Sequence, residues 1–353
     1  MNTIQPSERQ FGYLSPYLIA EIGVNHEGSL ERAKRMISAV ARAGGHAAKF
    51  QTYKAEKLAA ANSSPAYWDL SKEPAQSQFA LFKRWDSFGP EDYRVLAANC
   101  EDEGIDFLST PFDLDAVDML NPLMKTIKVA SADITNIPLL RKVAATCKPV
   151  IMSTGAALLE EVQLAVSTLN DGGAASVTLL HCVLNYPTLP ENAQLSQIIV
   201  LREHFGRHCS IGYSDHVVPD STGAMPALEI AALLGATVIE KHFTDDKSAP
   251  GNDHYHSMDE ADLTGFTRRL GEIQDLYGNG LRDLTLQHRA IKNARRRIVA
   301  ARDLAAGQVI SESDIIALRS DAGIEVAHWD AVLGRQLCKP VNSGTPVCWS
   351  DLT

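Results

Sequence analysis

Two histidines lie at positions from which they could share chemistry. His216 and His242 each end a short apolar run of the sequence. If the second run is a strand, Glu240 and His242 share one face and Lys241 takes the other, because strand side chains alternate. Two neutral imidazoles at neighbouring strand ends can hold a divalent metal and leave positions open. The alternative is that both histidines only hydrogen-bond to backbone where loops begin.

Two lysines indicate a second kind of chemistry. Lys49 and Lys128 end two other apolar runs. In a closed barrel both ammonium groups can face one point, together with the hydroxyl groups of Thr110, Ser131, Ser153 and Ser214. Such a set can bind phosphate or carboxylate, each charge-assisted contact contributing about 1.5–3 kcal/mol. The competing interpretations are a Schiff-base lysine and two lysines whose charged ends reach solvent.

Carboxylates and further histidines flank these positions. Glu21 follows an apolar run and is a candidate acid or base, although it could instead anchor a lysine. Asp253, in the sequence GNDHYH, could bind sugar hydroxyl groups. His254 and His256 share that loop and could be metal ligands by count. Loop histidines are usually solvated, so we do not include them in the predicted site.

The spacing of apolar residues predicts how these side chains are positioned. Short apolar runs alternate with segments in which apolar residues recur every three or four positions. The predicted strands are Tyr17–Ile22, Ala47–Gln51, Asp106–Thr110, Thr126–Ala130, Val150–Ser153, Val177–Cys182, Ser210–Tyr213 and Thr237–His242. The alternation predicts an α/β fold, a TIM (β/α)8 barrel, with an open doubly wound sheet as the competitor. Polar residues end all eight runs, as expected where a barrel carries its chemistry.

The chain of 353 residues is long enough for two domains, and its sequence pattern changes near residue 278. We predict a barrel domain at 1–278, a linker at 279–294 and a small β-rich domain at 295–353, too small to be stable without packing on something larger. Residues 54–87 are too many for a plain βα loop. Their aromatic residues either contribute to a sugar pocket or only pack: Tyr67, Trp68, Phe79, Phe82 and Trp85.

Composition excludes several classes of function. A formal net charge of -10 disfavours binding to nucleic acid and to anionic membranes. The sequence has neither a signal-peptide pattern at its start nor an apolar run near the ~20 residues of a membrane span. Its six cysteines form no C-x-x-C pair, which favours reduced thiols over a disulfide framework. We therefore expect a cytoplasmic protein.

Eight motifs in order give the chain a family resemblance. EIGVNHEGS, AAKFQTY, FLSTPFD, KVASAD, IMSTGA, LLHCVLNYPT, IGYSDH and IEKHFT resemble the sialic acid synthase family, and the C-terminal part resembles its antifreeze-like (SAF) domain. The resemblance implies condensation of phosphoenolpyruvate with an open-chain N-acylated hexosamine, such as N-acetylmannosamine, which releases phosphate and yields a sialic acid-type nonulosonate. It also implies a domain-swapped homodimer.

The resemblance also implies roles for individual residues. Phosphoenolpyruvate would be bound by Lys49, Thr110, Lys128, Ser131, Ser153 and Ser214. The sugar would face Gln51, Tyr186, Asp253 and, from the SAF domain of the partner subunit, the residue equivalent to Arg319. His216 and His242 would hold a divalent metal (Mn, Mg, Co or Zn). Glu21 would serve the proton transfers, with Asp133 as a possible second acid.

Departures from the family pattern concern the sugar. Asp133 stands where the family often has glutamate, Leu184 where neuraminate synthases have asparagine, and Asn252 and Ser320 where prolines are usual. The acceptor could therefore be N-acetylmannosamine, its 6-phosphate, or a diacetamido sugar leading to legionaminic or pseudaminic acid. A Schiff-base aldolase and a non-catalytic sugar-binding protein of the same fold are further alternatives.

Overall fold

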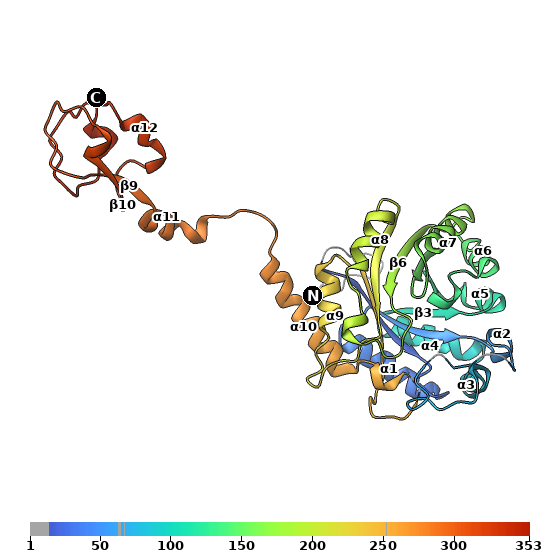
Figure 1. Cartoon of the computed structure of the whole chain (residues 1–353). Coiled ribbons are helices and arrows are strands. Elements are labelled where there is room, and N and C mark those ends of the chain that lie inside the picture. The colour runs from blue at the N-terminus through green and yellow to red at the C-terminus, as the bar shows by residue number, and fades with distance from the viewer. Residues whose placement is uncertain (1–13, 63–64, 67, 252) are drawn as a thin grey trace. The chain divides into compact units, whose positions relative to one another are not determined.

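The first of two compact units is a parallel barrel surrounded by helices (Figure 1). The computed structural model describes residues 14–62, 65–66, 68–251 and 253–353, and the units divide between Tyr277 and Gly278. The barrel strands are β1 (Tyr17–Gly23), β2 (Ala47–Thr52), β3 (Asp106–Pro111), β4 (Ile127–Val129), β5 (Pro149–Ser153), β6 (Ser176–Cys182), β7 (Cys209–Asp215) and β8 (Val238–His242).

The order of the strands closes the ring. Neighbours run β3-β2-β1-β8-β7-β6-β5-β4, all pairs are parallel, and β3 and β4 at the two ends of this order also contact each other. The predicted TIM barrel is confirmed, and the open doubly wound sheet is excluded. Each predicted strand overlaps an observed one and differs from it by one or two residues at its ends.

Helices with an apolar face cover the outside of the ring. They are α1 (Leu30–Arg42), α4 (Pro90–Asp102), α5 (Leu114–Leu120), α6 (Ile137–Ala144), α7 (Leu159–Asp171), α8 (Gln197–Phe205), α9 (Pro226–Leu233) and α10 (Glu260–Tyr277). In α1 the Ser29 side chain accepts a hydrogen bond from the backbone N–H of Arg32, which caps the helix start. Met36, Ile37 and Val40 are then buried at the spacing of one helix face.

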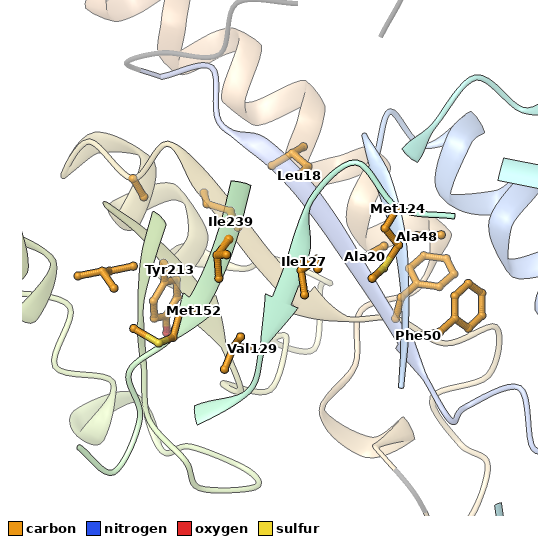
Figure 2. Packing of buried hydrophobic residues seen from close by; sticks show 14 of the residues in the cluster. Leu18, Ala20, Ala48, Phe50, Met124, Ile127, Val129, Met152, Tyr213 and Ile239 are labelled. Atoms are coloured by element: carbon orange, nitrogen blue, oxygen red, sulfur yellow. The ribbon is translucent and has the colours of Figure 1, made fainter. Parts of the chain in front are cut away.

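Alternation along the strands produces two apolar layers. One lies between strands and helices, and Figure 2 shows Leu18 and Ala20 of β1 with Ala48 and Phe50 of β2 among its residues. The other forms a floor inside the barrel: Ile19, Ala47, Leu108, Ile151, Leu180 and Val238. Gly212 of β7 lies at this floor, where an added Cβ would stand 2.4 Å from the Val238 carbonyl oxygen. Only glycine fits there.

The excursion after β2 contains α2 (Ala55–Leu58) and α3 (Gln78–Trp85). Lys54 joins the two ends of this excursion, because its side chain donates to the carbonyl oxygens of Asp86 (2.6 Å) and Phe88 (3.1 Å). The aromatic residue Tyr67 lies outside the described residues.

The second unit has its own small core. β9 (Arg296–Ala300) pairs antiparallel with β10 (Ile315–Arg319), and α12 (Trp329–Val332) follows. Ten buried apolar residues pack together: Ile298, Ala300, Leu304, Ile310, Ile315, Ile324, Val332, Leu337, Val341 and Val347. The stretch predicted as a linker contains α11 (His288–Ala294).

The structure also bears on the predictions of reduced cysteines and of a chain without a membrane span. All six cysteines are free; Cys100, Cys182 and Cys209 are buried, whereas Cys147 and Cys338 are exposed. In the part of the chain that the structure describes, every helix is too short or too polar to cross a membrane.

Candidate functional site

A polar layer lies directly on the apolar floor, at the carboxyl ends of the strands. Glu21 is two residues after the floor residue Ile19, and Lys49 is two residues after Ala47. Side chains two apart on a strand share a face, so both lie on the inner side of the barrel above the floor. The same step leads to Thr110, Ser153, Cys182 and Glu240. These residues line one cavity of ≈ 310 Å³, at the small end of the range for small-molecule sites.

Two lysines and two carboxylates form a buried charge network in this layer. Lys49 makes an ion pair with Glu21, and its Nζ is 3.6 Å from a Glu240 oxygen. Lys128 Nζ is 3.7 Å from the other Glu240 oxygen. All four side chains are at least 93 % buried. The predicted meeting of Lys49 and Lys128 at one rim is confirmed, and Glu240 is a central residue that the sequence-based site omitted.

Burial and neighbouring charges displace the pKa values of this network in different directions. Burial raises the pKa of Glu21 above its ordinary value, even though Lys49 opposes the shift. For Glu240 burial is outweighed by Lys128 and Lys49, so its pKa lies below the ordinary value. Burial lowers the pKa of Lys128, whereas Glu21 and Glu240 overcome burial and raise the pKa of Lys49. Glu21 is therefore the carboxyl group better suited to exchange protons.

Hydroxyl groups orient the two ammonium groups. Lys49 Nζ donates to Thr110 Oγ1 at 3.3 Å, and Lys128 Nζ donates to Ser153 Oγ at 2.8 Å. Ser214 Oγ donates to Glu240 at 3.1 Å. Ser131, which begins a 3-10 helix directly after β4, also lines the cavity. All four hydroxyl groups predicted for an anion site thus lie in one cavity with both lysines.

Gly155 packs closely against the cavity residue Ser131. The Gly155 backbone N–H donates to Ser131 Oγ at 2.9 Å. An added Cβ on Gly155 would lie 2.9 Å from Ser131 Oγ and 3.1 Å from the Leu184 backbone nitrogen. Leu184, one of the predicted departures from neuraminate synthases, lines the cavity.

The two predicted metal-site histidines lie side by side. The ring centroids of His216 and His242 are 5.4 Å apart, and both rings line the cavity. His216 Nδ1 is 2.8 Å from the Val183 carbonyl oxygen, which orients the ring and leaves Nε2 as its free nitrogen. Burial lowers the pKa of His216 to about 4, so the ring is neutral and able to bind a cation at pH 7.

The interpretation of the GNDHYH loop as solvated was wrong. His254 and His256 are fully buried, because this loop folds back as a 3-10 helix, His254–His256, held by Ser257 Oγ donating to the Asp253 carbonyl oxygen at 2.6 Å. The His256 ring centroid is 5.0 Å from that of His242. A loop assignment alone could not reveal this, since burial there comes from long-range packing.

This corner of the cavity has the donor chemistry of a metal site. Ligand atoms of His242, Asp253 and His256 all lie within 4.8 Å of one another, while His216 falls outside that limit. His242 Nδ1 is 3.4 Å from an Asp253 oxygen. Among the described residues, His242 Nδ1 and both nitrogens of His256 are buried without a hydrogen-bond partner. Such unpaired groups are costly unless something binds them, so the residues fit a divalent metal.

The residues predicted to face a sugar are divided between the two units. Gln51, Tyr186 and Asp253 line the cavity, and Gln51 Nε2 donates to Glu21 at 3.0 Å. Burial, with Glu21 and Glu73, raises the pKa of Asp253 to about 7. Arg319 belongs to the second unit, where it is exposed at the end of β10.

Apolar side chains form another part of the cavity lining, called here the apolar wall. Trp68, Phe82 and Trp85, from the excursion after β2, line the cavity. Asp133 lines it as well, and burial raises its pKa although Asn136 donates to it at 2.9 Å. The cavity therefore has an apolar wall, a layer of charged groups on the apolar floor and a corner rich in imidazole.

A (β/α)8 barrel with lysines, carboxylates and imidazoles converging at the carboxyl ends of its strands has the architecture of a barrel enzyme for small polar substrates. The chain belongs to the NeuB family, whose model matches residues 36–282, and the SAF domain model matches residues 295–353.

Relatives extend over nearly the whole chain. The N,N'-diacetyllegionaminic acid synthase of Legionella pneumophila is 35% identical over 95% of this chain and 94% of its own length. The N-acetylneuraminate-9-phosphate synthase of Drosophila melanogaster is 31% identical over 96% of each. Among solved structures, the N-acetylneuraminic acid (sialic acid) synthetase of Leptospira borgpetersenii has a TM-score of 0.70 and 31% identity, with 82% of this chain and 94% of that one covered. The family resemblance of the sequence is thereby confirmed.

Proposed function

We propose that the protein condenses phosphoenolpyruvate with an N-acylated hexosamine, releasing phosphate and forming a sialic acid-type nonulosonate. The observation that carries the proposal is the meeting of Lys49 and Lys128 with four hydroxyl groups in one buried cavity. Together they supply charge-assisted donors for a phosphate and a carboxylate on one small molecule. The names of the NeuB-family relatives support the same reaction.

Each predicted residue receives a role in this reaction. Phosphoenolpyruvate is bound by Lys49, Thr110, Lys128, Ser131, Ser153 and Ser214. The sugar contacts Gln51, Tyr186 and Asp253, and the arginine equivalent to Arg319 reaches it from the partner subunit of a domain-swapped homodimer. His216 and His242 hold the divalent metal, and Glu21 and Asp133 exchange protons.

The chain's own groups account for the proton and charge transfers. The enol carbon of phosphoenolpyruvate attacks the sugar aldehyde, whose oxygen takes up a proton and becomes a hydroxyl group. Water adds at C2 and gives up one proton, the C2–O bond to phosphate breaks, and loss of the remaining hydroxyl proton at C2 leaves the 2-keto group. Glu21, whose pKa is raised by burial, accepts the proton of the attacking water, and Gln51 and Lys49 hold its carboxylate in place. The lysines stabilise the departing phosphate. A bound metal supplies Lewis-acid polarisation of the aldehyde oxygen.

Charge at the sugar side favours an uncharged acceptor over a 6-phosphate. Among the described residues that line the cavity, the cationic side chains are Lys49 and Lys128, and both face carboxylates. Glu73, Asp133 and Asp253 add acidic groups to the lining of the cavity. A second phosphate would be repelled there, which supports N-acetylmannosamine or a neutral diacetamido sugar.

A panel of acceptors tests the proposal. The purified enzyme is incubated with phosphoenolpyruvate, a divalent metal and, separately, N-acetylmannosamine, its 6-phosphate and a 2,4-diacetamido-2,4,6-trideoxyhexose. Phosphate release and the mass of the product are measured. We expect turnover with a neutral sugar; turnover with the 6-phosphate alone would contradict the choice of acceptor, and no phosphate release with any sugar would contradict the reaction.

One observation favours a second candidate, a Schiff-base aldolase. Burial lowers the pKa of Lys128, as a nucleophilic amine requires. Borohydride reduction in the presence of pyruvate would then add the mass of a reduced pyruvyl group to the chain. We expect no such adduct, because Lys128 is held by Ser153 and the Val129 carbonyl oxygen.

A further inference from the structure

We propose that His256 is a third imidazole ligand of the metal that His216 and His242 hold. The site then prefers Co²⁺, Zn²⁺ or another transition ion to Mg²⁺ and binds it in the absence of substrates. The inference rests on the proposed use of a metal and deepens it.

The three rings form a triangle. Centroids are separated by 5.4 Å for His216 and His242, 5.0 Å for His242 and His256, and 5.9 Å for His216 and His256. Imidazoles bound to one ion through nitrogens about 2.0–2.1 Å away have centroids about 4.5–5.5 Å apart. Two separations fall in this range and the third slightly exceeds it. His216, whose nitrogens lie outside the 4.8 Å group, therefore has to rotate inward when the ion binds.

Neighbouring oxygen atoms indicate which nitrogens are left for the metal. His216 Nδ1 faces the Val183 carbonyl oxygen at 2.8 Å. The two Asp253 oxygens lie 3.4 Å from His242 Nδ1 and 3.8 Å from His256 Nε2. Carbonyl and carboxylate groups commonly accept from the outer nitrogen of a metal-bound histidine. The remaining nitrogens are His216 Nε2, His242 Nε2 and His256 Nδ1.

The buried His256 ring is destabilising unless something binds its nitrogens. Both of its nitrogens are inaccessible to solvent and lack a hydrogen-bond partner among the described residues. An unpaired buried polar group destabilises the folded state, so a ring with two of them needs a ligand or an enclosed water. His254, in the same turn, differs because its Nδ1 is 2.7 Å from Thr244 Oγ1.

A third imidazole changes the choice of ion. Mg²⁺ prefers oxygen ligands and keeps several waters, whereas imidazole suits Zn²⁺, Co²⁺ and other transition ions. Three histidines therefore favour a transition ion that remains bound through turnover. With two histidines and substrate oxygens, Mg²⁺ would compete better.

The test counts bound imidazoles and uses no substrate. The full-length protein is freed of metal with a chelator and loaded with Co²⁺, and proton NMR counts the hyperfine-shifted imidazole N–H signals. We expect three signals in the wild type, two in His256→Gln and three in the matched control His254→Gln. Titration of the visible Co²⁺ absorption should show affinity weakened more than about 100-fold in His256→Gln, beyond the usual effect of losing an orienting group.

Other outcomes overturn the inference. Two signals in the wild type, an unchanged count in His256→Gln, or displacement of Co²⁺ by millimolar Mg²⁺ would each contradict it. If His256→Gln loses the wild-type circular dichroism spectrum, His256→Asn replaces it, and the wild-type count remains decisive. Failure of the synthase assay leaves this result untouched, because no sugar or phosphoenolpyruvate is present.

Discussion

Replacing Lys128 by methionine separates what this lysine does for the substrate from what it does for the fold. The change keeps most of the buried stem and removes the ammonium group that donates to Ser153 Oγ at 2.8 Å and lies 3.7 Å from Glu240. Glu240 keeps Lys49 at 3.6 Å and the hydroxyl group of Ser214 as partners. Glu240 therefore keeps one neighbouring cation, which it shares with Glu21.

The effect on phosphoenolpyruvate follows from one lost charge-assisted contact. Such a contact contributes about 1.5–3 kcal/mol, which corresponds to a fall in kcat/KM for phosphoenolpyruvate of roughly 10- to 150-fold. The Lys128 ammonium group is itself destabilised by burial, which lowers its pKa, so its removal should leave the Tm unchanged or higher. The KM for the sugar should change little.

Phosphate release at varied phosphoenolpyruvate and thermal unfolding without substrate measure the two effects. Lys125→Met is the matched control, because Lys125 is three residues earlier and its side chain is 76% exposed. Unchanged phosphoenolpyruvate kinetics in Lys128→Met would refute the anion-binding role. A large fall in Tm together with equal loss for both substrates would show that the lysine supports the fold instead.

Three further predictions test other parts of the structure. Burial lowers the pKa of His26 to about 4, so protons bind the unfolded chain first, and this histidine makes stability fall by up to about 3 kcal/mol between pH 6.5 and pH 4. In urea unfolding His26→Gln should therefore show a shallower fall in stability over this pH range than the wild type, and an equal fall would contradict the assignment. Gly155→Ala should displace Ser131 and raise the KM for phosphoenolpyruvate about tenfold, whereas Gly271→Ala, with nothing within 4 Å, should not. Arg319→Ala should raise the sugar KM about tenfold and leave the oligomeric state unchanged in size-exclusion chromatography, and normal sugar kinetics would contradict the proposed cross-subunit role.

The barrel could be predicted because the two sequence patterns that indicate it each lie within a few consecutive residues. Apolar runs a few residues long alternate with segments of helical period, and polar residues end every run. Strand ends at Glu21, Lys49 and Thr110 could then be brought together by topology alone, since all parallel strands end at one rim. The ends of the strands were less predictable, as β4 is reduced to Ile127–Val129.

The rest of the site depends on contacts that sequence spacing does not encode. His256 is buried because the loop after β8 folds back, with Asn25 Nδ2 donating to the Phe243 carbonyl oxygen at 2.9 Å and to Ser257 Oγ at 3.2 Å. Glu240 had a signal, because it shares a face with His242, but its position between two lysines required the closed ring. Trp68 lines the cavity from an excursion with no periodicity of its own.

Side chains on β7 and β8 alternate between those that face the cavity and those that hold the two strands together. Ser214 and Glu240 are paired in register and face the cavity. Their neighbours Asp215 and Lys241, also in register, form an ion pair at 2.7 Å with both side chains 1% exposed, and Asp215 also accepts from Tyr213 at 2.7 Å. This second pair fixes the strand ends that carry His216 and His242. A shift of one of these strands by one residue would exchange its inward and outward side chains and remove its imidazole from the cavity, so the register of both strands determines the site.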